Sequence, residues 1–336
     1  MEPKIDLDQI LDDLGPLFAS RAGAYDDNDR FAADNYADLI EYNIFSGLIP
    51  LEYGGGGATH DAMCQFLRRL AHHCPSTALA LSMHQHLVAA AVANDRAGRP
   101  GRKLLDKVAE SELVLVSTGA NDWLESNGTA EPVEGGYLIS AIKPFASGSP
   151  AGDLMVTSAR LENDPDDVQV LHFPLSLRSE GVTFLDDWRT LGMRATGSQT
   201  IKLENVFVHE EAVVLKRPSG PFHPAFAVIL TVALPLIMSA YLGTAEAAVA
   251  IARERAGKRG DDGIAPVLVG EMLNALTTAE LATADMIRLA NNFDFTPSAE
   301  LASEVLIRKT LAANAVKQAC DKALEVSGGA GFFRKA

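Results

Sequence analysis

Cysteine is scarce in this sequence, and no Cys-x-x-Cys pair occurs. The three thiols are Cys64, Cys74 and Cys320 in 336 residues. So few thiols, odd in number, exclude a disulfide-stapled fold and a cysteine-based metal site, and they indicate a reducing compartment. Basic residues are also few, with 29 Lys and Arg against 44 Asp and Glu and a formal net charge of −15. This charge argues against nonspecific nucleic-acid binding, so an anionic ligand would need a local basic cluster.

Three further absences narrow the function classes. Residues 1–17 contain four aspartates and no apolar run, so no secretory signal peptide is expected. The glycine run 54–57 has no Gly-Lys-Ser/Thr after it and no expected strand before it, which argues against a phosphate-cradling loop. The histidines in the segments 72–73 and 84–86 have no carboxylate at ligand spacing. We therefore expect satisfied or exposed histidines and no metal.

One stretch is apolar enough to cross a bilayer. No Asp, Glu, Lys or Arg occurs between Arg217 and Glu246. Thr231 and Ser239 interrupt the stretch, and the same periodic segment continues into charged residues after Glu246. The central helix of a soluble bundle has the same composition. We therefore predict no membrane span and a cytoplasmic protein.

The spacing of apolar residues divides the chain into three parts. Residues 1–113 have mostly helical spacing, with helices expected near 7–18, 29–42, 63–70 and 76–94. Short alternating runs bounded by Gly, Asp, Asn and Pro then indicate strands at 113–118, 137–143, 153–161, 168–173, 182–185 and 199–206. Three long helical segments follow, at 224–255, 265–291 and 297–326.

We therefore predict an α+β multidomain fold. Residues 1–113 would form an N-terminal α-helical domain, and residues 114–215 a middle antiparallel β-barrel-like domain, because short connections without helices favour antiparallel pairing. Residues 216–336 would form a C-terminal domain of the four-helix-bundle type, which could continue beyond residue 336.

The strand expected at 137–143 ends in an unusual way. Pro144 removes a backbone donor, and the segment 147–150 (Ser-Gly-Ser-Pro) has turn chemistry. An aromatic ring, Phe145, and a small hydroxyl, Ser147, are thus held at the end of a rigid element. Such an end can form a platform for a flat, hydrogen-bonding cofactor. An ordinary strand end with a core phenylalanine fits the same residues.

Five segments, in this order, resemble motifs of the acyl-CoA dehydrogenase family of flavoproteins. They are 49–55 (Ile-Pro-Leu-Glu-Tyr-Gly-Gly), 116–119 (Val-Ser-Thr-Gly), 143–148 (Lys-Pro-Phe-Ala-Ser-Gly), 191–198 with 203–208, and 326–332 (Val-Ser-Gly-Gly-Ala-Gly-Phe). Together they cover nearly the whole chain. The resemblance implies the family's acyl-CoA dehydrogenase-like fold and FAD as the cofactor.

The resemblance also assigns residues to the cofactor. They are Val116, Ser117, Thr118, Phe145, Ala146, Ser147, Arg255, Gly328 and Gly329. Phe145 and Ser147 stand where the family has Trp and Thr, and the Ser147 hydroxyl would face flavin N5. The turn at 328–329 would touch FAD of a neighbouring subunit. Arg255, in the cation-rich stretch 253–259, would meet the pyrophosphate, although a solvated helix end explains that stretch equally well.

The reaction implied by the resemblance is the α,β-oxidation of an acyl thioester. A carboxylate removes the α-proton, and a hydride passes to flavin N5. The catalytic base stays unknown, because the matching helix position is about Ala233 and no acid occurs between Phe222 and Ala245. A glutamate about two dozen positions beyond Gly329 would supply it in a longer chain. The loop 119–126 also departs from the family's Glu-Pro-x-Ala-Gly-Ser-Asp.

Three functions share this scaffold. We favour a dehydrogenase-like oxidoreductase acting on an acyl-CoA or another apolar small molecule, with an electron acceptor as partner. The oxygenase component of a two-component monooxygenase, which takes reduced flavin from a flavin reductase, needs no α-proton base and suits the Phe-Ala-Ser-Gly-Ser run. A flavin-binding protein without catalysis is the third. The resemblance implies a homodimer or homotetramer in each case.

Overall fold

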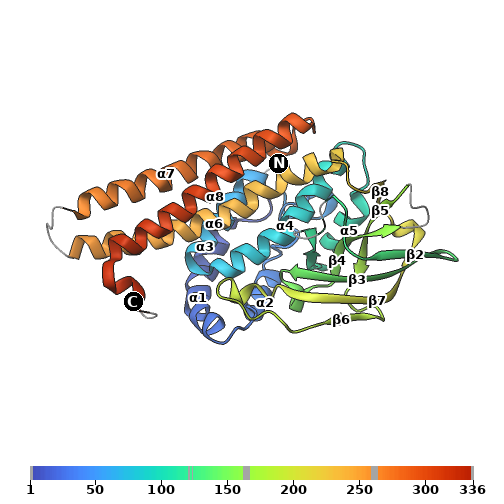
Figure 1. The fold of residues 1–336 in the computed structure, drawn as a ribbon, viewed down its shortest axis with the longest axis horizontal. Helices are drawn as coiled ribbons and strands as arrows, with labels where there is room; N and C mark the ends of the chain where they lie inside the picture. The colour runs from blue at the N-terminus through green and yellow to red at the C-terminus, as the bar shows by residue number, and fades with distance from the viewer. Residues whose placement is uncertain (1–2, 120–121, 123, 162–166, 259–263, 334–336) are drawn as a thin grey trace.

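The computed structural model describes residues 3–119, 122, 124–161, 167–258 and 264–333. Its elements follow the predicted order of helices, strands and helices. Figure 1 shows the strands gathered at one end and the long C-terminal helices extending to the other. The expected α+β architecture is confirmed. The boundaries near residues 113 and 215 stay a prediction, since one hydrophobic core joins the N-terminal helices to the first C-terminal helix.

Five helices form the N-terminal part of the described chain. They are α1 (Leu7–Asp27), α2 (Ala33–Glu41), α3 (His60–His73), α4 (Pro75–Arg96) and α5 (Arg102–Ser111). Asp6 and Thr59 cap α1 and α3 by accepting a backbone N–H bond in the first turn of each helix. The apolar pattern did not separate α5 as an element, because this short helix buries only Leu105 and Val108.

The buried His84 connects α4 to its neighbours. Its Nε2 donates to the Phe45 carbonyl (2.8 Å), and its Nδ1 accepts from the Leu115 amide (2.9 Å). Both bonds together require the neutral ring, and burial lowers the pKa of His84 to about 4. The neighbouring His86 is also buried, but its Nδ1 has no partner among the described residues. His84 thus meets the expectation of a satisfied histidine.

Eight strands form one sheet in the described chain. They are β1 (Leu115–Ser117), β2 (Thr129–Val133), β3 (Gly136–Ala146), β4 (Leu154–Leu161), β5 (Gln169–Ser176), β6 (Val182–Phe184), β7 (Gln199–His209) and β8 (Leu215–Pro218). Their order is β6-β7-β3-β2-β4-β5-β8, with β1 beside β4. The sequence pattern missed β2 and β8, since each is short and contains a proline, Pro132 or Pro218.

The sheet is mixed, not antiparallel throughout as predicted. The pairs β1–β4 and β2–β4 run parallel, and the remaining pairs are antiparallel. Parallel pairing needs a long connection. The segment between β1 and β4, which contains β2 and β3, supplies one for the first pair. As a result β1 and β3 are not neighbours, because β2 and β4 lie between them.

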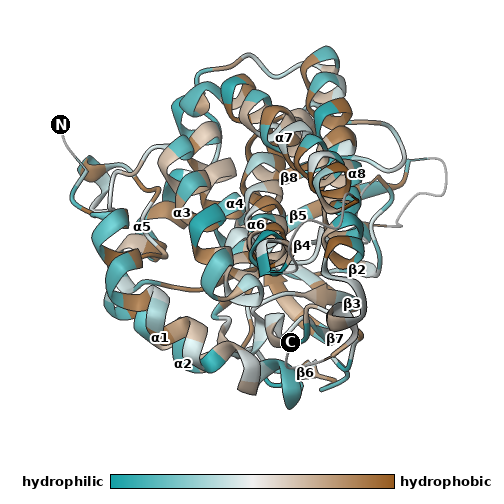
Figure 2. Ribbon diagram, turned by 90° about the vertical axis from the view of Figure 1, so that its left-hand side faces the viewer, coloured by the Kyte–Doolittle hydropathy of each residue, from teal (hydrophilic) through white to brown (hydrophobic). Residues whose placement is uncertain are grey.

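Three long helices form the described C-terminal part, where a four-helix-bundle type was predicted. They are α6 (Pro224–Lys258), α7 (Ala265–Ala290) and α8 (Ala299–Ser327). Figure 2 looks along the bundle and shows α6 enclosed between α3 and α4 on one side and α7 and α8 on the other. Gly243 permits the close approach of α3, because a Cβ at this position would lie 1.9 Å from the Arg68 carbonyl oxygen.

The helix α6 passes the length and hydropathy test for a membrane span, as the sequence indicated. In this structure 72% of its most apolar window is buried within the protein. Val228, Val232 and Leu236 belong to the same core as the N-terminal helices. These contacts agree with the prediction of a core helix.

Candidate flavin site

The predicted flavin residues lie in two groups, one at the ends of β1 and β3 and the other at the C-terminal ends of α6 and α8. We call the first the strand-end group; it comprises Val116, Ser117, Thr118, Phe145, Ala146 and Ser147. The second, the helix-end group, comprises Arg255, Gly328 and Gly329. The turn after β3 brings the two halves of the strand-end group together, because a Cβ on Gly152 would lie 2.5 Å from Val116 Cγ2.

The end of β3 presents its aromatic ring to the outside. Pairing with β7 continues past Pro144 to Ala146, with an irregularity after Lys143. Within this irregularity Phe145 has φ of +62°, a conformation that residues with a side chain rarely adopt. Its side chain is 50% exposed. The alternative of a core phenylalanine is therefore wrong, and a ring is available as one wall of a ligand site.

Three hydroxyls form a chain directly after this ring. Ser147 Oγ lies 2.8 Å from Ser198 Oγ, and Ser198 Oγ lies 2.7 Å from Thr196 Oγ1. Thr196 Oγ1 in turn donates to the Met193 carbonyl at 2.8 Å. Ser198 and Thr196 are buried, whereas Ser147 is half-buried. Of the three hydrogen-bonded hydroxyls, that of Ser147 is thus the one that a ligand can reach.

The loop between β6 and β7 joins the strand-end group to α6. The Trp188 ring meets Phe145 edge to face, with 6.1 Å between ring centroids, and its Nε1 donates to the Met193 carbonyl (3.1 Å). Met193 Sδ in turn accepts from the Tyr241 hydroxyl of α6 at 3.9 Å. These residues form a rim where the sheet meets the helices. The site prediction missed Trp188, Thr196, Ser198 and Tyr241, although the motif at 191–198 contains two of them.

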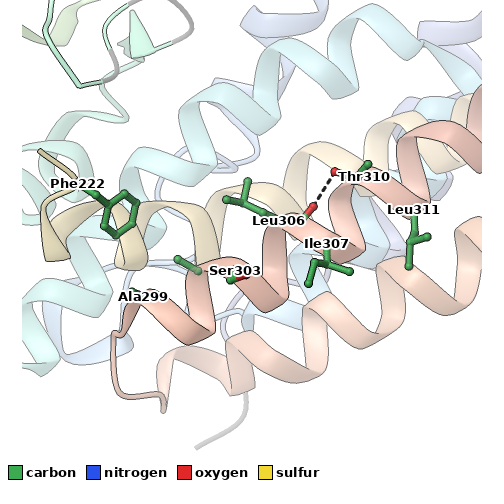
Figure 3. A pocket seen from close by; sticks show the side chains of 8 residues that line it. Phe222, Ala299, Ser303, Leu306, Ile307, Thr310 and Leu311 are labelled. Carbon is green, nitrogen blue, oxygen red and sulfur yellow. Dashed lines mark hydrogen bonds between the residues drawn. The ribbon is translucent and has the colours of Figure 1, made fainter. Parts of the chain in front are cut away.

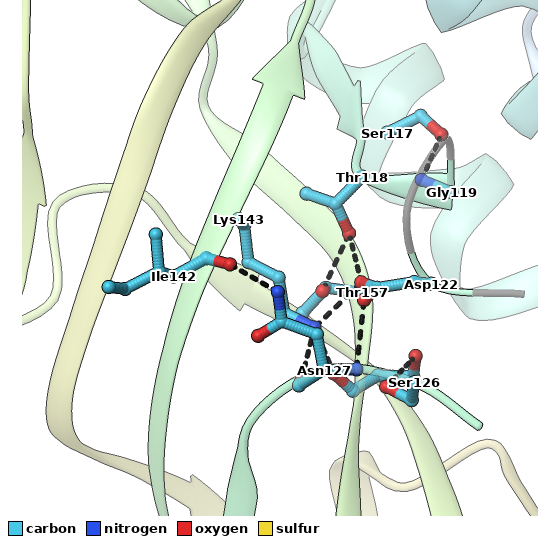
Figure 4. Close-up of polar contacts among 10 residues, drawn as sticks. Ser117, Thr118, Gly119, Asp122, Ser126, Asn127, Ile142, Lys143 and Thr157 are labelled. Carbon is cyan, nitrogen blue, oxygen red and sulfur yellow. Dashed lines mark hydrogen bonds and ion pairs between the residues drawn. The ribbon is translucent and has the colours of Figure 1, made fainter.

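A buried ion pair connects the two halves of the strand-end group (Figure 4). Lys143 is fully buried, and its Nζ donates to Asp122 Oδ2 (2.6 Å) and to the Asn127 and Ser158 carbonyls (2.6 and 2.7 Å). Burial lowers the pKa of the Lys143 ammonium, and Asp122 opposes that shift. This side chain thus links β3 to β4 and to the segment that follows β1.

The same network occupies the Thr118 side chain. Thr118 Oγ1 donates to Asp122 Oδ2 (3.0 Å) and lies 2.7 Å from Thr157 Oγ1. Its hydroxyl is buried and satisfied within the protein, so a cofactor could meet only its backbone. Of the loop 119–126, which departs from the family motif, residues 120, 121 and 123 lie outside the described residues.

An unsatisfied polar atom lies against the turn that follows Ser147. The buried Tyr36 hydroxyl has no hydrogen-bond partner among the described residues, and it lies 2.9 Å from where a Cβ on Gly148 would be. Gly148 has φ of +75°, so a side chain here would be strained as well as crowded. An exposed ring, a reachable hydroxyl and a backbone turn without a side chain suit a flat cofactor with hydrogen-bonding edges.

The helix-end group lies where α6 and α8 both end, since Ala252 and Val326 share one hydrophobic cluster there. Within the described chain Arg255 forms no ion pair, and Gly329 is exposed with open space around its Cβ position. Figure 1 shows the C-terminal ends of α6 and α8 away from β3. The predicted contact with a neighbouring subunit stays a prediction.

An apolar groove of about 500 Å³ lies along α8, apart from both groups (Figure 3). It is lined by Phe222, Ala299, Ala302, Ser303, Leu306, Ile307, Thr310 and Leu311. None of the predicted flavin residues contributes to it. We therefore do not assign it to the cofactor.

Comparison with known proteins supports the predicted resemblance. Residues 17–112 match the acyl-CoA dehydrogenase N-terminal domain. Dibenzothiophene monooxygenase of Rhodococcus erythropolis is 28% identical over an alignment of 238 residues that covers 65% of this chain and 54% of that protein. The match thus spans about half the length of this relative. Isobutylamine N-hydroxylase of Streptomyces viridifaciens is 28% identical over 85% of this chain and 77% of its own length.

Solved structures share the fold over nearly the whole chain. Methanesulfinate monooxygenase of Pseudomonas fluorescens superposes with a TM-score of 0.84 at 22% identity, covering 96% of this chain and 87% of its own. TdsC of Paenibacillus, solved with FMN, superposes with a TM-score of 0.82 at 18% identity, covering 96% of this chain and 87% of its own. XiaF of Streptomyces, solved with FADH2, superposes with a TM-score of 0.80 at 24% identity, covering 98% of this chain and 86% of its own. The chain thus shares the fold of these proteins over nearly its whole length.

These comparisons bear on which of the three predicted functions is best supported. The relatives and neighbours named above are monooxygenases or hydroxylases, or are solved with flavin, so an oxidoreductase is supported. They favour the oxygenase alternative over the acyl-CoA dehydrogenase that the sequence analysis favoured. Their ligands agree with the prediction of a flavin and leave FAD and FMN both open.

Proposed function

We propose that this protein is the oxygenase component of a two-component flavin-dependent monooxygenase. It would take reduced flavin from a separate reductase and oxygenate an apolar small molecule. The observation that carries this proposal is the composition of the site. Among the described residues its ring, hydroxyls and rim come from Phe145, Ser147, Trp188, Met193 and Tyr241, and these include no carboxylate to remove an α-proton.

Each part of the strand-end group has a role in this proposal. Phe145 would support one face of the flavin ring, and Ser147 Oγ would hydrogen-bond its central nitrogen. Trp188, Met193 and Tyr241 would cover the edge where the sheet meets α6 and so keep water away from the reacting atoms. A reduced flavin bound there supplies the chemistry that activates oxygen.

The remaining expectations belong to the same proposal. The mixed apolar and aromatic rim favours an apolar substrate, consistent with dibenzothiophene in the name of one relative. We further propose a cytoplasmic homodimer or homotetramer in which the helix-end group meets the flavin of another copy. The reductase would be a separate chain that delivers the flavin by diffusion.

An acyl-CoA dehydrogenase is the second candidate, because residues 17–112 match that family's N-terminal domain. The test is to add an acyl-CoA series anaerobically to the purified protein, and separately to mix protein and reduced flavin with oxygen in a stopped-flow instrument. The oxygenase predicts no bleaching by acyl-CoA and a reoxidation trace that differs from that of free flavin. Tightly bound FAD that an acyl-CoA reduces would instead establish the dehydrogenase. A trace identical to free flavin, without bleaching, would contradict both.

A further inference from the structure

The direction of the hydrogen bonds in the hydroxyl chain is fixed at its buried end. The Met193 carbonyl can only accept, so Thr196 Oγ1 donates its single proton to it. Thr196 must then accept across the 2.7 Å contact, which makes Ser198 the donor. Since the one proton of Ser198 is used there, Ser147 is the donor across the 2.8 Å contact to Ser198.

This order decides what Ser147 offers to a ligand. Its proton points inward to Ser198, so its oxygen presents lone pairs on the reachable side. Ser198 and Thr196 are 4% and 1% exposed, so bulk water has little access to either as a competing partner. The Met193 carbonyl also accepts from Trp188 Nε1 and from the Thr196 amide, but a reversed chain would set the lone pairs of Thr196 Oγ1 against that carbonyl oxygen at 2.8 Å.

The two redox states of a flavin differ at the nitrogen that Ser147 would meet. Reduced flavin has an N–H at N5, whereas oxidised flavin has a lone pair there. A fixed acceptor therefore pairs with the reduced ring and faces the oxidised ring lone pair to lone pair. We propose that the relay Thr196–Ser198–Ser147 holds Ser147 as an acceptor and so makes the site selective for reduced flavin. This inference rests on the proposed function, because it needs a flavin at the end of β3.

The relay is tested by removing its anchor without changing its shape. Thr196→Val cannot donate to the Met193 carbonyl, so the protons of Ser198 and Ser147 are free to turn toward the flavin. We expect wild-type protein to bind reduced FMN more tightly than oxidised FMN in anaerobic titrations. In Thr196→Val this preference falls about tenfold, the value of roughly one hydrogen bond, and the potential of bound FMN falls by about 30 mV.

Two companion variants make the result specific. Ser198→Ala removes the acceptor that holds the Ser147 proton, so it shifts the potential in the same direction and serves if Thr196→Val does not fold. Ser140 lies on β3, and Ser140→Ala breaks only its two bonds with Asn205, which are outside the relay, so the potential of FMN bound to this variant stays at the wild-type value. FAD is used as a second probe in every titration.

The titrations distinguish failure of the proposed function from failure of the relay. If the wild-type protein binds neither FMN nor FAD in either redox state, both the proposed function and the relay are contradicted. If it binds both redox states, and Thr196→Val and Ser198→Ala keep the wild-type potential, only the relay is contradicted. Tighter binding of oxidised than of reduced FMN by the wild type also overturns the relay.

Discussion

The two groups of predicted flavin residues differ in how many contacts within the described chain hold them in place. Around the strand-end group, Lys143 links β3 to β4 and to the segment after β1, and the relay links Ser147 to the loop before β7. In the helix-end group, Gly329 is exposed and Arg255 has no ionic partner within the described chain. The first group is thus organised before any ligand arrives, and the second is not.

This comparison indicates which of the two groups can make the site selective among ligands. A site whose donors and acceptors are fixed in advance discriminates between ligands without the cost of ordering them. Exposed residues at a helix end can add charge and affinity, but they cannot by themselves impose geometry. We therefore expect variants in the strand-end group to change both stability and flavin chemistry, and variants in the helix-end group to change affinity alone.

The largest effect is expected at Lys143. Lys143→Met leaves Asp122 buried without its partner, which should lower the free energy of unfolding by about 3–5 kcal/mol in urea denaturation. Arg255→Met, at the helix end, should stay within roughly 0.5 kcal/mol of wild type. The double variant Lys143→Met/Asp122→Leu should recover part of the loss, because no buried charge remains. Equal losses at Lys143 and Arg255 would contradict the comparison.

Acid should weaken the contact through which α4 supports β1. The pKa of His84 is lowered from 6.5 to about 4, so below pH 6.5 the unfolded chain takes up a proton that the folded protein refuses. Stability therefore falls from pH 6.5 towards pH 4, by on the order of 3 kcal/mol for this group, and the fall ends once the folded state is also protonated. Urea titrations at pH 7.5 and 4.5 measure it.

His84→Gln is the matched control for that titration. Its amide can keep both hydrogen bonds but cannot take up a proton, so it should be less stable at pH 7.5 yet lose less on acidification. An unchanged pH slope in this variant would show that His84 is not the group responsible. Burial also lowers the pKa of His86 to about 4. His86 therefore contributes equally to the loss of stability on acidification in the wild type and in His84→Gln.

The turn beneath Ser147 should resist a side chain more than an open turn does. Gly148→Ala adds a Cβ at positive φ next to the Tyr36 hydroxyl, whereas Gly98→Ala adds one at similar φ with nothing within 4 Å. Strain alone costs about 1–3 kcal/mol at either position, so the contact with Tyr36 should make Gly148→Ala the worse of the two by about 1 kcal/mol. Tyr36→Phe should reduce that excess, and a double-mutant cycle without coupling would contradict it.

The smallest change in stability with a clear functional result is expected at Ser147. Ser147→Ala should cost about 1 kcal/mol or less of stability and weaken the binding of reduced FMN about tenfold, because one hydrogen bond is lost. Arg255→Ala should weaken FAD a few-fold and leave FMN unchanged, since FMN lacks the pyrophosphate that an arginine would bind. Anaerobic titrations measure both. Unchanged FAD binding in Arg255→Ala would favour a solvated helix end.

Local pattern predicted most elements but not the path of the sheet. Periodicity located the long helices and six of the strands, because their spacing depends on neighbouring residues. The prolines in β2 and β8 hid those strands, and the parallel pairing of β4 depends on a return path that no local signal encodes. Of the residues that we propose for the flavin site, Phe145 and Ser147 were predicted from one motif. Trp188, Ser198 and Tyr241 were not predicted, because only tertiary packing brings them near Phe145 and Ser147.

The Trp188 ring beside Phe145 can report directly whether a flavin binds at the end of β3. The sequence has two tryptophans, so Trp123→Phe leaves Trp188, whose ring centroid lies 6.1 Å from that of Phe145. Anaerobic addition of reduced FMN to this variant should quench the Trp188 emission to saturation, with the same Kd that calorimetry gives. Calorimetric binding without quenching would place the flavin elsewhere, and no binding by either method would contradict a flavin-dependent function.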